Sequence, residues 1–89
     1  MASTDDAKLS TDLQRLLRTD ATATDHLLLR VTAVSHQAET AILAAGFQIH
    51  RKLTLVPTFA VSGPAGAVLD LVDQPWLISA DLDRPVHAQ

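Results

Sequence analysis

Residues 26–34 read His-Leu-Leu-Leu-Arg-Val-Thr-Ala-Val, and this stretch decides the fold. Every second residue from position 27 to position 33 is apolar, so these four side chains are expected to point to one side. They are Leu27, Leu29, Val31 and Ala33. Successive side chains of a β-strand point to opposite faces of its sheet, and this alternation therefore predicts a strand with one buried face. Other elements must cover that face, and they follow along the chain.

The next residues predict a helix and a second strand. Ser35 can cap a helix that runs to Ala45, and Gly46 can end it. A strand is expected from Phe47 to Val56, with an apolar face that Arg51 interrupts. The residues expected on that face are Phe47, Ile49, Leu53 and Leu55.

The order strand, helix, strand then recurs. Residues 58–61 predict a short third strand, and Ser62-Gly63-Pro64 is expected to open a second helix that ends before Asp73-Gln74-Pro75. Residues 76–82 predict a fourth strand. The apolar residues of this helix are Val68, Leu69, Leu71 and Val72, and those on one face of the fourth strand are Ile78, Ala80 and Leu82.

The order strand, helix, strand, strand, helix, strand predicts an α+β fold of the ferredoxin-like βαββαβ plait. This plait has a four-stranded antiparallel sheet with two helices on one face. We expect residues 26–83 to form it, with a polar N-terminal extension over residues 1–25 and an extended tail over residues 84–89. The second face of the sheet is then uncovered, and an exposed, partly apolar face suggests a protein partner.

The N-terminal extension contains one apolar pattern with helical spacing. It consists of Leu9, Leu13, Leu16 and Leu17. Thr11 and Gln14 fit a capping box, so a short amphipathic helix is expected there. Two interpretations remain open at this point, a frayed extension and a helix that docks on a partner.

Composition excludes several classes of function. A chain of 89 residues is sufficient for one domain, and its aromatic content of 3% leaves almost no rings on which nucleobases could stack. The net charge of −3 has the wrong sign for a nucleic-acid partner. No apolar run approaches the roughly 20 residues of a membrane span, and the first residues do not resemble a secretion signal. We therefore expect a cytoplasmic protein that binds neither nucleic acid nor membrane.

Catalytic and metal chemistry are not expected either. The chain has no cysteine, which excludes disulfides, thiolate zinc sites and thiol nucleophiles. The histidines are His26, His36, His50 and His87, and no two of them have the spacing of a metal-ligand motif. Ser35 beside His36 is explained by helix capping. The sequence thus predicts no enzyme, no cofactor and no metal site.

Two carboxylates near the end of the fourth strand are the best candidate site. Asp81 and Asp83 are two positions apart, so both are expected on one face of the strand. The apolar residues Ile78, Ala80 and Leu82 are expected on the other face. Such a pair is either a solvated edge or a cap for backbone amides of a partner.

The last two elements also resemble a known family. Residues 69–83, Leu-Asp-Leu-Val-Asp-Gln-Pro-Trp-Leu-Ile-Ser-Ala-Asp-Leu-Asp, resemble the helix, turn, strand and acidic pair of the propeptides of subtilisin-like serine proteases, the inhibitor I9 family. The tail over residues 84–89 is similar in length and character to the end of such propeptides, and the resemblance covers roughly residues 26–89. The turn departs from the family pattern, because Gln74 stands where the family usually has Asp.

The resemblance implies an inhibitor, and possible assistance in folding, of a subtilisin-like serine protease. In that family the open sheet face packs on two helices of the protease, whose N-termini an acidic pair matching Asp81 and Asp83 would cap. The tail enters the substrate cleft as an added strand. Its last four residues here are Val86, His87, Ala88 and Gln89, with Gln89 in the specificity pocket. A chain that begins at Met1 and ends at Gln89 fits a stand-alone form better than a precursor.

An ACT-like domain that binds a small molecule is the alternative. Its strand–helix–strand opening is similar to residues 27–34 followed by residues 42–49, although the usual Asp-x-Pro-Gly turn is missing from residues 34–37. An ACT-like domain should bind an amino acid and dimerise through its sheet. An inhibitor should bind a protease of the subtilisin class and depend on its tail.

Overall fold

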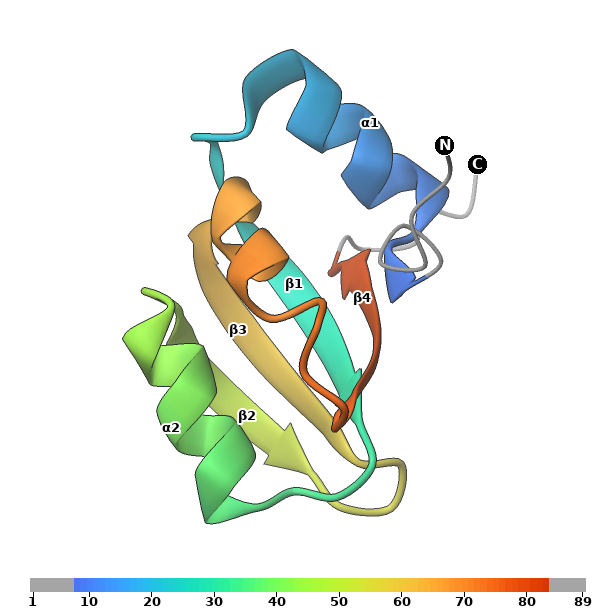
Figure 1. The fold of residues 1–89 in the computed structure, drawn as a ribbon, viewed down its shortest axis with the longest axis vertical. Helices are drawn as coiled ribbons and strands as arrows, with labels where there is room; N and C mark the ends of the chain where they lie inside the picture. Colours follow the sequence, from blue (N-terminus) through green and yellow to red (C-terminus); the bar gives the residue numbers. More distant parts are fainter. Residues whose placement is uncertain (1–7, 84–89) are drawn as a thin grey trace.

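The computed structural model describes residues 8–83 and has an α+β architecture built on one four-stranded sheet. The elements are α1 (Thr11–Asp20), β1 (Thr24–Val31), α2 (His36–Ala44), β2 (Gln48–Leu53), β3 (Thr58–Pro64), the 3-10 helix η2 (Ala65–Asp70) and β4 (Leu77–Leu82). The strand order is β2-β3-β1-β4, and neighbouring strands are antiparallel. Both α2 and η2 lie over one face of the sheet (Figure 1). The predicted plait is therefore confirmed.

The core lies between this sheet face and the helices. In β1, Leu27 and Leu29 are fully buried, as their alternation predicts, and they pair with Val61 and Phe59 of β3. Ile42 of α2 packs into the same cluster. The helix-bearing side is thus the only side on which the central strands bury large apolar side chains within residues 8–83.

Helix α2 begins and ends where the sequence predicts. The Ser35 side chain accepts a hydrogen bond from the backbone N–H of Ala38 at 3.2 Å, which satisfies a donor of the first turn. Gly46 follows the helix with a φ of 107°, a left-handed conformation that glycine adopts without steric cost. The chain can therefore reverse directly into β2.

Helix α1 is part of the core. Leu13 is fully buried, and the segment before the helix reaches β4, where Leu9 forms a parallel bridge with Ala80 and the Ser10 N–H donates to the Ala80 carbonyl at 3.0 Å. Ser10 is the cap, since its side chain accepts from the Leu13 N–H, so the expected Thr11–Gln14 capping box is wrong. Instead of fraying, α1 covers the β4 end of the sheet.

The second helix is shorter than predicted. Residues 62–64 extend β3 instead of opening a helix, and only the six residues of η2 are helical. The N–H groups of Ala65 and Gly66 donate to the carbonyls of Ala23 and Ala21, at 2.9 and 2.7 Å. A Cβ at Gly66 would lie 2.9 Å from the Ala21 oxygen, so glycine is required for this approach. These contacts with the α1–β1 loop fix where the helix can start.

The buried face of β4 also differs from the prediction at one residue. The register against β1 shifts between Arg30 and Val31, so that Leu77 pairs with Val31 and Ile78 is left without a partner. Leu77 is consequently 1% exposed, whereas Ile78 is 48% exposed. Ala80 and Leu82 are buried as predicted, because they lie beyond the irregularity.

A second bulge, between Ile49 and Arg51, alters β2. It places Lys52 opposite Phe59, where its Nζ donates to Oε2 of Glu39 on α2 at 2.7 Å. This hydrogen bond lowers the pKa of the Glu39 carboxyl below its ordinary value of 4.5. Leu53, expected on the buried face, pairs with Thr58 and is exposed as a result. Leu55 is exposed for another reason, because β2 ends at Leu53 instead of Val56 and Leu55 lies in the turn that follows.

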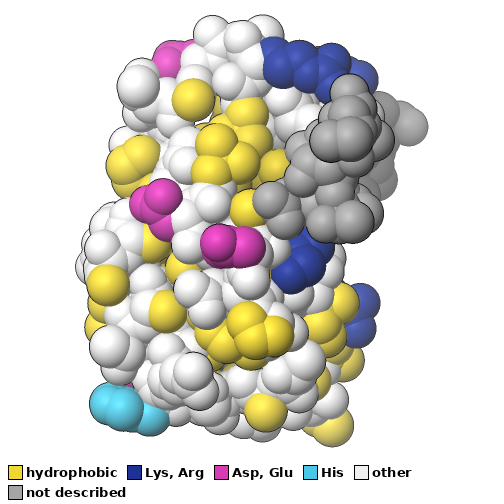
Figure 2. Space-filling model, in the orientation of Figure 1, with side chains coloured by type: hydrophobic (Ala, Val, Ile, Leu, Met, Phe, Trp, Pro, Cys, Tyr) yellow, Lys and Arg dark blue, Asp and Glu magenta, His cyan; other side chains and the backbone are white. Residues whose placement is uncertain are grey.

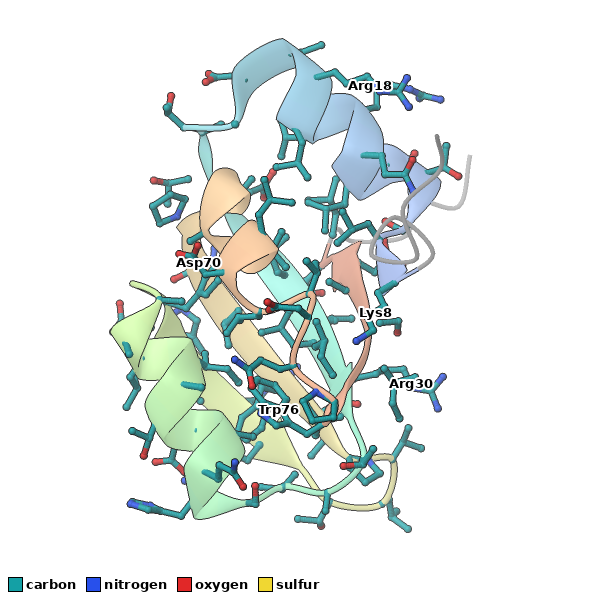
Figure 3. The ribbon with its side chains drawn as sticks, in the orientation of Figure 1. Lys8, Arg18, Arg30, Asp70 and Trp76 are labelled. Atoms are coloured by element: carbon teal, nitrogen blue, oxygen red, sulfur yellow. The ribbon has the colours of Figure 1, made fainter. Side chains whose placement is uncertain are left out.

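The loop before β4 is held from two directions. The Nζ of Lys8 donates to the carbonyl of Gln74 at 3.0 Å, and the Thr32 N–H donates to the carbonyl of Trp76 at 2.9 Å. Figure 3 shows Lys8 beside β4 and Trp76 at the loop that leads into this strand. The start of β4, and with it the position of Asp81, is therefore fixed to both the N-terminal segment and the end of β1.

Replacement of Leu13 by Ala should destabilise the whole domain, by about 2–4 kcal/mol, because it leaves a cavity under α1. Urea unfolding measures this change. Leu43→Ala is the matched control, since Leu43 on α2 is 51% exposed and its loss should cost far less. Equal stability of the Leu13→Ala variant and the unmodified chain would contradict a structural role for α1.

Candidate functional site

The face of the sheet opposite α2 and η2 is the candidate site. Alternation along the paired strands places a set of side chains from all four strands on this open face. The set is His26, Leu28, Arg30, Gln48, Arg51, Leu53, Thr58, Ala60, Ser62, Ser79 and Asp81. His50, the extra residue of the β2 bulge, also lies on this face, because its ring contacts Ser62 and the ring of His26. None of the helices within residues 8–83 lies over it, and the expectation of an uncovered face is met.

The open face is apolar at its centre and charged toward its sides. Leu28 pairs with Ala60 on one side and with Asp81 on the other. Ala60 is only 5% exposed because its neighbours on adjacent strands shield it, and Arg30 and Arg51 flank this centre. A flat surface with an apolar centre and a charged rim suits contact with another protein.

One hollow of the described surface lies beside α1. A groove of about 340 Å³ between α1 and β4 is lined by Asp12, Arg15, Leu16, Thr19 and Leu82. The helix-bearing face has separate apolar patches between polar groups (Figure 2), and Leu43 and Leu69 are exposed there. The residues that line the groove beside α1 are not those of the open face, apart from their shared strand β4.

Asp81 lies on the open face of the edge strand β4. Its side chain is exposed, and Oδ1 accepts a hydrogen bond from the backbone N–H of Leu82 at 2.7 Å. Ala80 and Leu82, its neighbours in the strand, are buried on the opposite side. This carboxylate can accept further hydrogen bonds from a partner, because an ionised carboxylate has about four acceptor positions.

Asp83 follows β4 directly. Its backbone N–H donates to the carbonyl of His26 at 2.8 Å, which continues the β1–β4 ladder by one bond, and the residue is half-buried. Asp81 and Asp83 therefore lie at the same end of the β4 edge. The four candidate tail residues, Val86, His87, Ala88 and Gln89, lie outside the described residues.

Two histidines that sequence reasoning left separate come together on the open face. The ring centres of His26 and His50 are 5.5 Å apart, and Nε2 of His50 lies 2.7 Å from Oγ of Ser62. Their strands, β1 and β2, are separated by β3, so no spacing along the chain reveals the pair. The strand order of the predicted plait indicates that β1 and β2 lie on either side of β3. The register of β2 against β3 depends on the bulge at His50, however, and no sequence motif marks this bulge.

Larger groups of metal-ligating side chains are not found in the part of the chain that the structure describes. Residues 8–83 contain no cluster of three or more histidine, aspartate, glutamate or cysteine side chains able to hold a metal ion. Nor does any helix in this range combine the length and apolar character needed to cross a membrane.

Comparison with protein-family models, with curated proteins and with solved structures finds no match to this chain.

Proposed function

We propose that this chain inhibits a subtilisin-like serine protease by docking its open sheet face on the enzyme. The observation that carries the proposal is the position of Asp81, an exposed carboxylate on the uncovered face of the edge strand β4. Beside it, Leu28 and Ala60 supply the apolar centre of the contact. The plait topology of this chain is also the topology that the family resemblance implies.

The acidic pair has the chemistry to receive helix N-termini of the protease. The first turn of a helix has backbone N–H groups without intrahelical partners and a partial positive charge, and both favour a nearby carboxylate. Asp81 is exposed on the open face, and Asp83 follows at the end of the same strand. Two helices resting on the sheet would thus find their caps at one edge of it.

The tail would enter the substrate cleft from this same edge. Strand β4 ends at Leu82, and the sequence continues into residues 84–89, which we propose bind as an extended strand. Pro85 restricts its own backbone and that of Arg84 to conformations near the extended one. Part of the outer edge of β4 is already occupied, because Leu9 and Ser10 contact Ala80. The protease would accordingly contact the face and the tail.

Removal of the tail is the first test. A chain ending at Pro85 should lose most of its inhibition of a broad-specificity subtilisin in steady-state assays, whereas its urea unfolding should be nearly unchanged, because a terminal segment contributes little to the core. Equal inhibition by the two chains would refute the tail mechanism. No inhibition by either chain, with amino-acid binding detected calorimetrically, would favour the ACT-like alternative.

Neutralisation of the acidic pair tests the docking face. Asp81→Asn/Asp83→Asn should weaken inhibition by about 1–2 kcal/mol, or about 5- to 30-fold, because two charges are lost at helix ends. The matched control is Asp70→Asn/Asp73→Asn, which removes the same charge from exposed positions outside the open face; Figure 3 labels Asp70 beside η2. Equal loss of inhibition in both variants would indicate a general charge effect and contradict specific capping.

A further inference from the structure

A row of three polar side chains crosses the open face. It consists of His50 from β2, Ser62 from β3 and His26 from β1. His26 pairs directly with Ser62 in the β1–β3 ladder, and Oγ of Ser62 lies 2.7 Å from Nε2 of His50. Both histidines are exposed. Two imidazoles from non-adjacent strands are thus brought to one point at the surface.

The bulge in β2 creates this row. Ile49 pairs with Val61 and Arg51 pairs with Ala60, so His50 is the extra residue between them. Gln48 is the residue that pairs with Ser62, and in an uninterrupted ladder His50 would lie opposite Ala60, diagonal to Ser62. A β-bulge redirects a side chain in this way, and such bulges are often found beside functional sites.

The separation of the two rings fits joint coordination of a metal ion. A zinc ion lies about 2.1 Å from a bound imidazole nitrogen and so about 3.2 Å from the ring centre, which places two tetrahedrally bound rings about 5 to 6 Å apart. The ring centres of His26 and His50 are 5.5 Å apart, and their planes are tilted by 43°. The contact of His50 with Ser62 resembles the hydrogen bonds that orient histidine ligands in metal sites.

We infer that His26 and His50 together bind a divalent transition-metal ion of the zinc class on the open face. Imidazole is a ligand for Zn²⁺, Ni²⁺ and Cu²⁺, whereas Mg²⁺ and Ca²⁺ prefer oxygen. No third histidine, aspartate or glutamate within residues 8–83 completes a cluster, so water or a group of a partner fills the remaining positions.

The charges around the pair have both signs. Arg51 follows His50 in the bulge and opposes a cation, whereas Asp83 follows β4 and its N–H donates to the carbonyl of His26. The site uses residues other than the proposed capping pair, and its test needs no protease.

Isothermal titration of the full chain with Zn²⁺ alone tests the site, together with the ring resonances of the histidines in NMR spectra. We expect one ion per chain and a higher Tm with Zn²⁺, no response to Mg²⁺, and perturbed ring signals for His26 and His50. His26→Ala and His50→Ala should each lower the zinc affinity about tenfold or more. His36→Ala and His87→Ala are matched controls and should retain it.

Two results would overturn the inference. One is the absence of zinc binding by the folded chain. The other is zinc binding that survives loss of His26 or of His50 but falls in the His36→Ala or His87→Ala variant, because the ion would then lie elsewhere. The unfolding transition of each variant in urea verifies that it is folded, and His26→Gln and His50→Gln replace any alanine variant that is not.

Discussion

The pairing of β1 with β3 is the contact on which the rest of the structure depends. It sets Leu27 against Val61 and Leu29 against Phe59 on one face of the sheet. Ile42 of α2, Val68 of η2 and Leu13 of α1 are all buried in the cluster that these residues begin. A chain of 89 residues with few aromatics has apolar material for one such layer, and the second face of the sheet is left open.

That open face follows from the same alternation that builds the core. Each buried residue of a central strand is followed by one that points outward, so burial of Leu27 and Leu29 directs His26, Leu28 and Arg30 to the other side. The proposed protease contact and the proposed metal site both use this face. They use different residues of it, Asp81 and Asp83 for the protease contact and His26 and His50 for the metal ion. The two sites adjoin where the Asp83 N–H donates to the carbonyl of His26.

Local signals in the sequence were sufficient to predict the elements and the plait, but not the irregularities. Alternation in β1, the Ser35 cap and Gly46 act within a few residues. The cap, the glycine and the burial of Leu27, Leu29 and Val31 are found as predicted, whereas β1 ends at Val31 and leaves Ala33 exposed. The two bulges depend on pairing between distant strands, which is why the exposure of Ile78 and the approach of His50 to His26 could not be predicted. Likewise, Ser10 is fixed as the cap of α1 by its bond to Ala80, a contact between residues far apart in the chain. The position of Asp81, by contrast, needed only the alternation of β4 beyond the bulge.

In the proposed complex, the open face is the surface that contacts the protease. NMR cross-saturation from a subtilisin whose catalytic serine is replaced by alanine tests it most directly, because this method identifies the residues at the contact. Docking through the open face should saturate the amides of β1, β3 and β4 around Leu28, Ala60 and Asp81, with little saturation at α2 and η2. A complex in which saturation is confined to α2 and η2, with the open face unaffected, would contradict it.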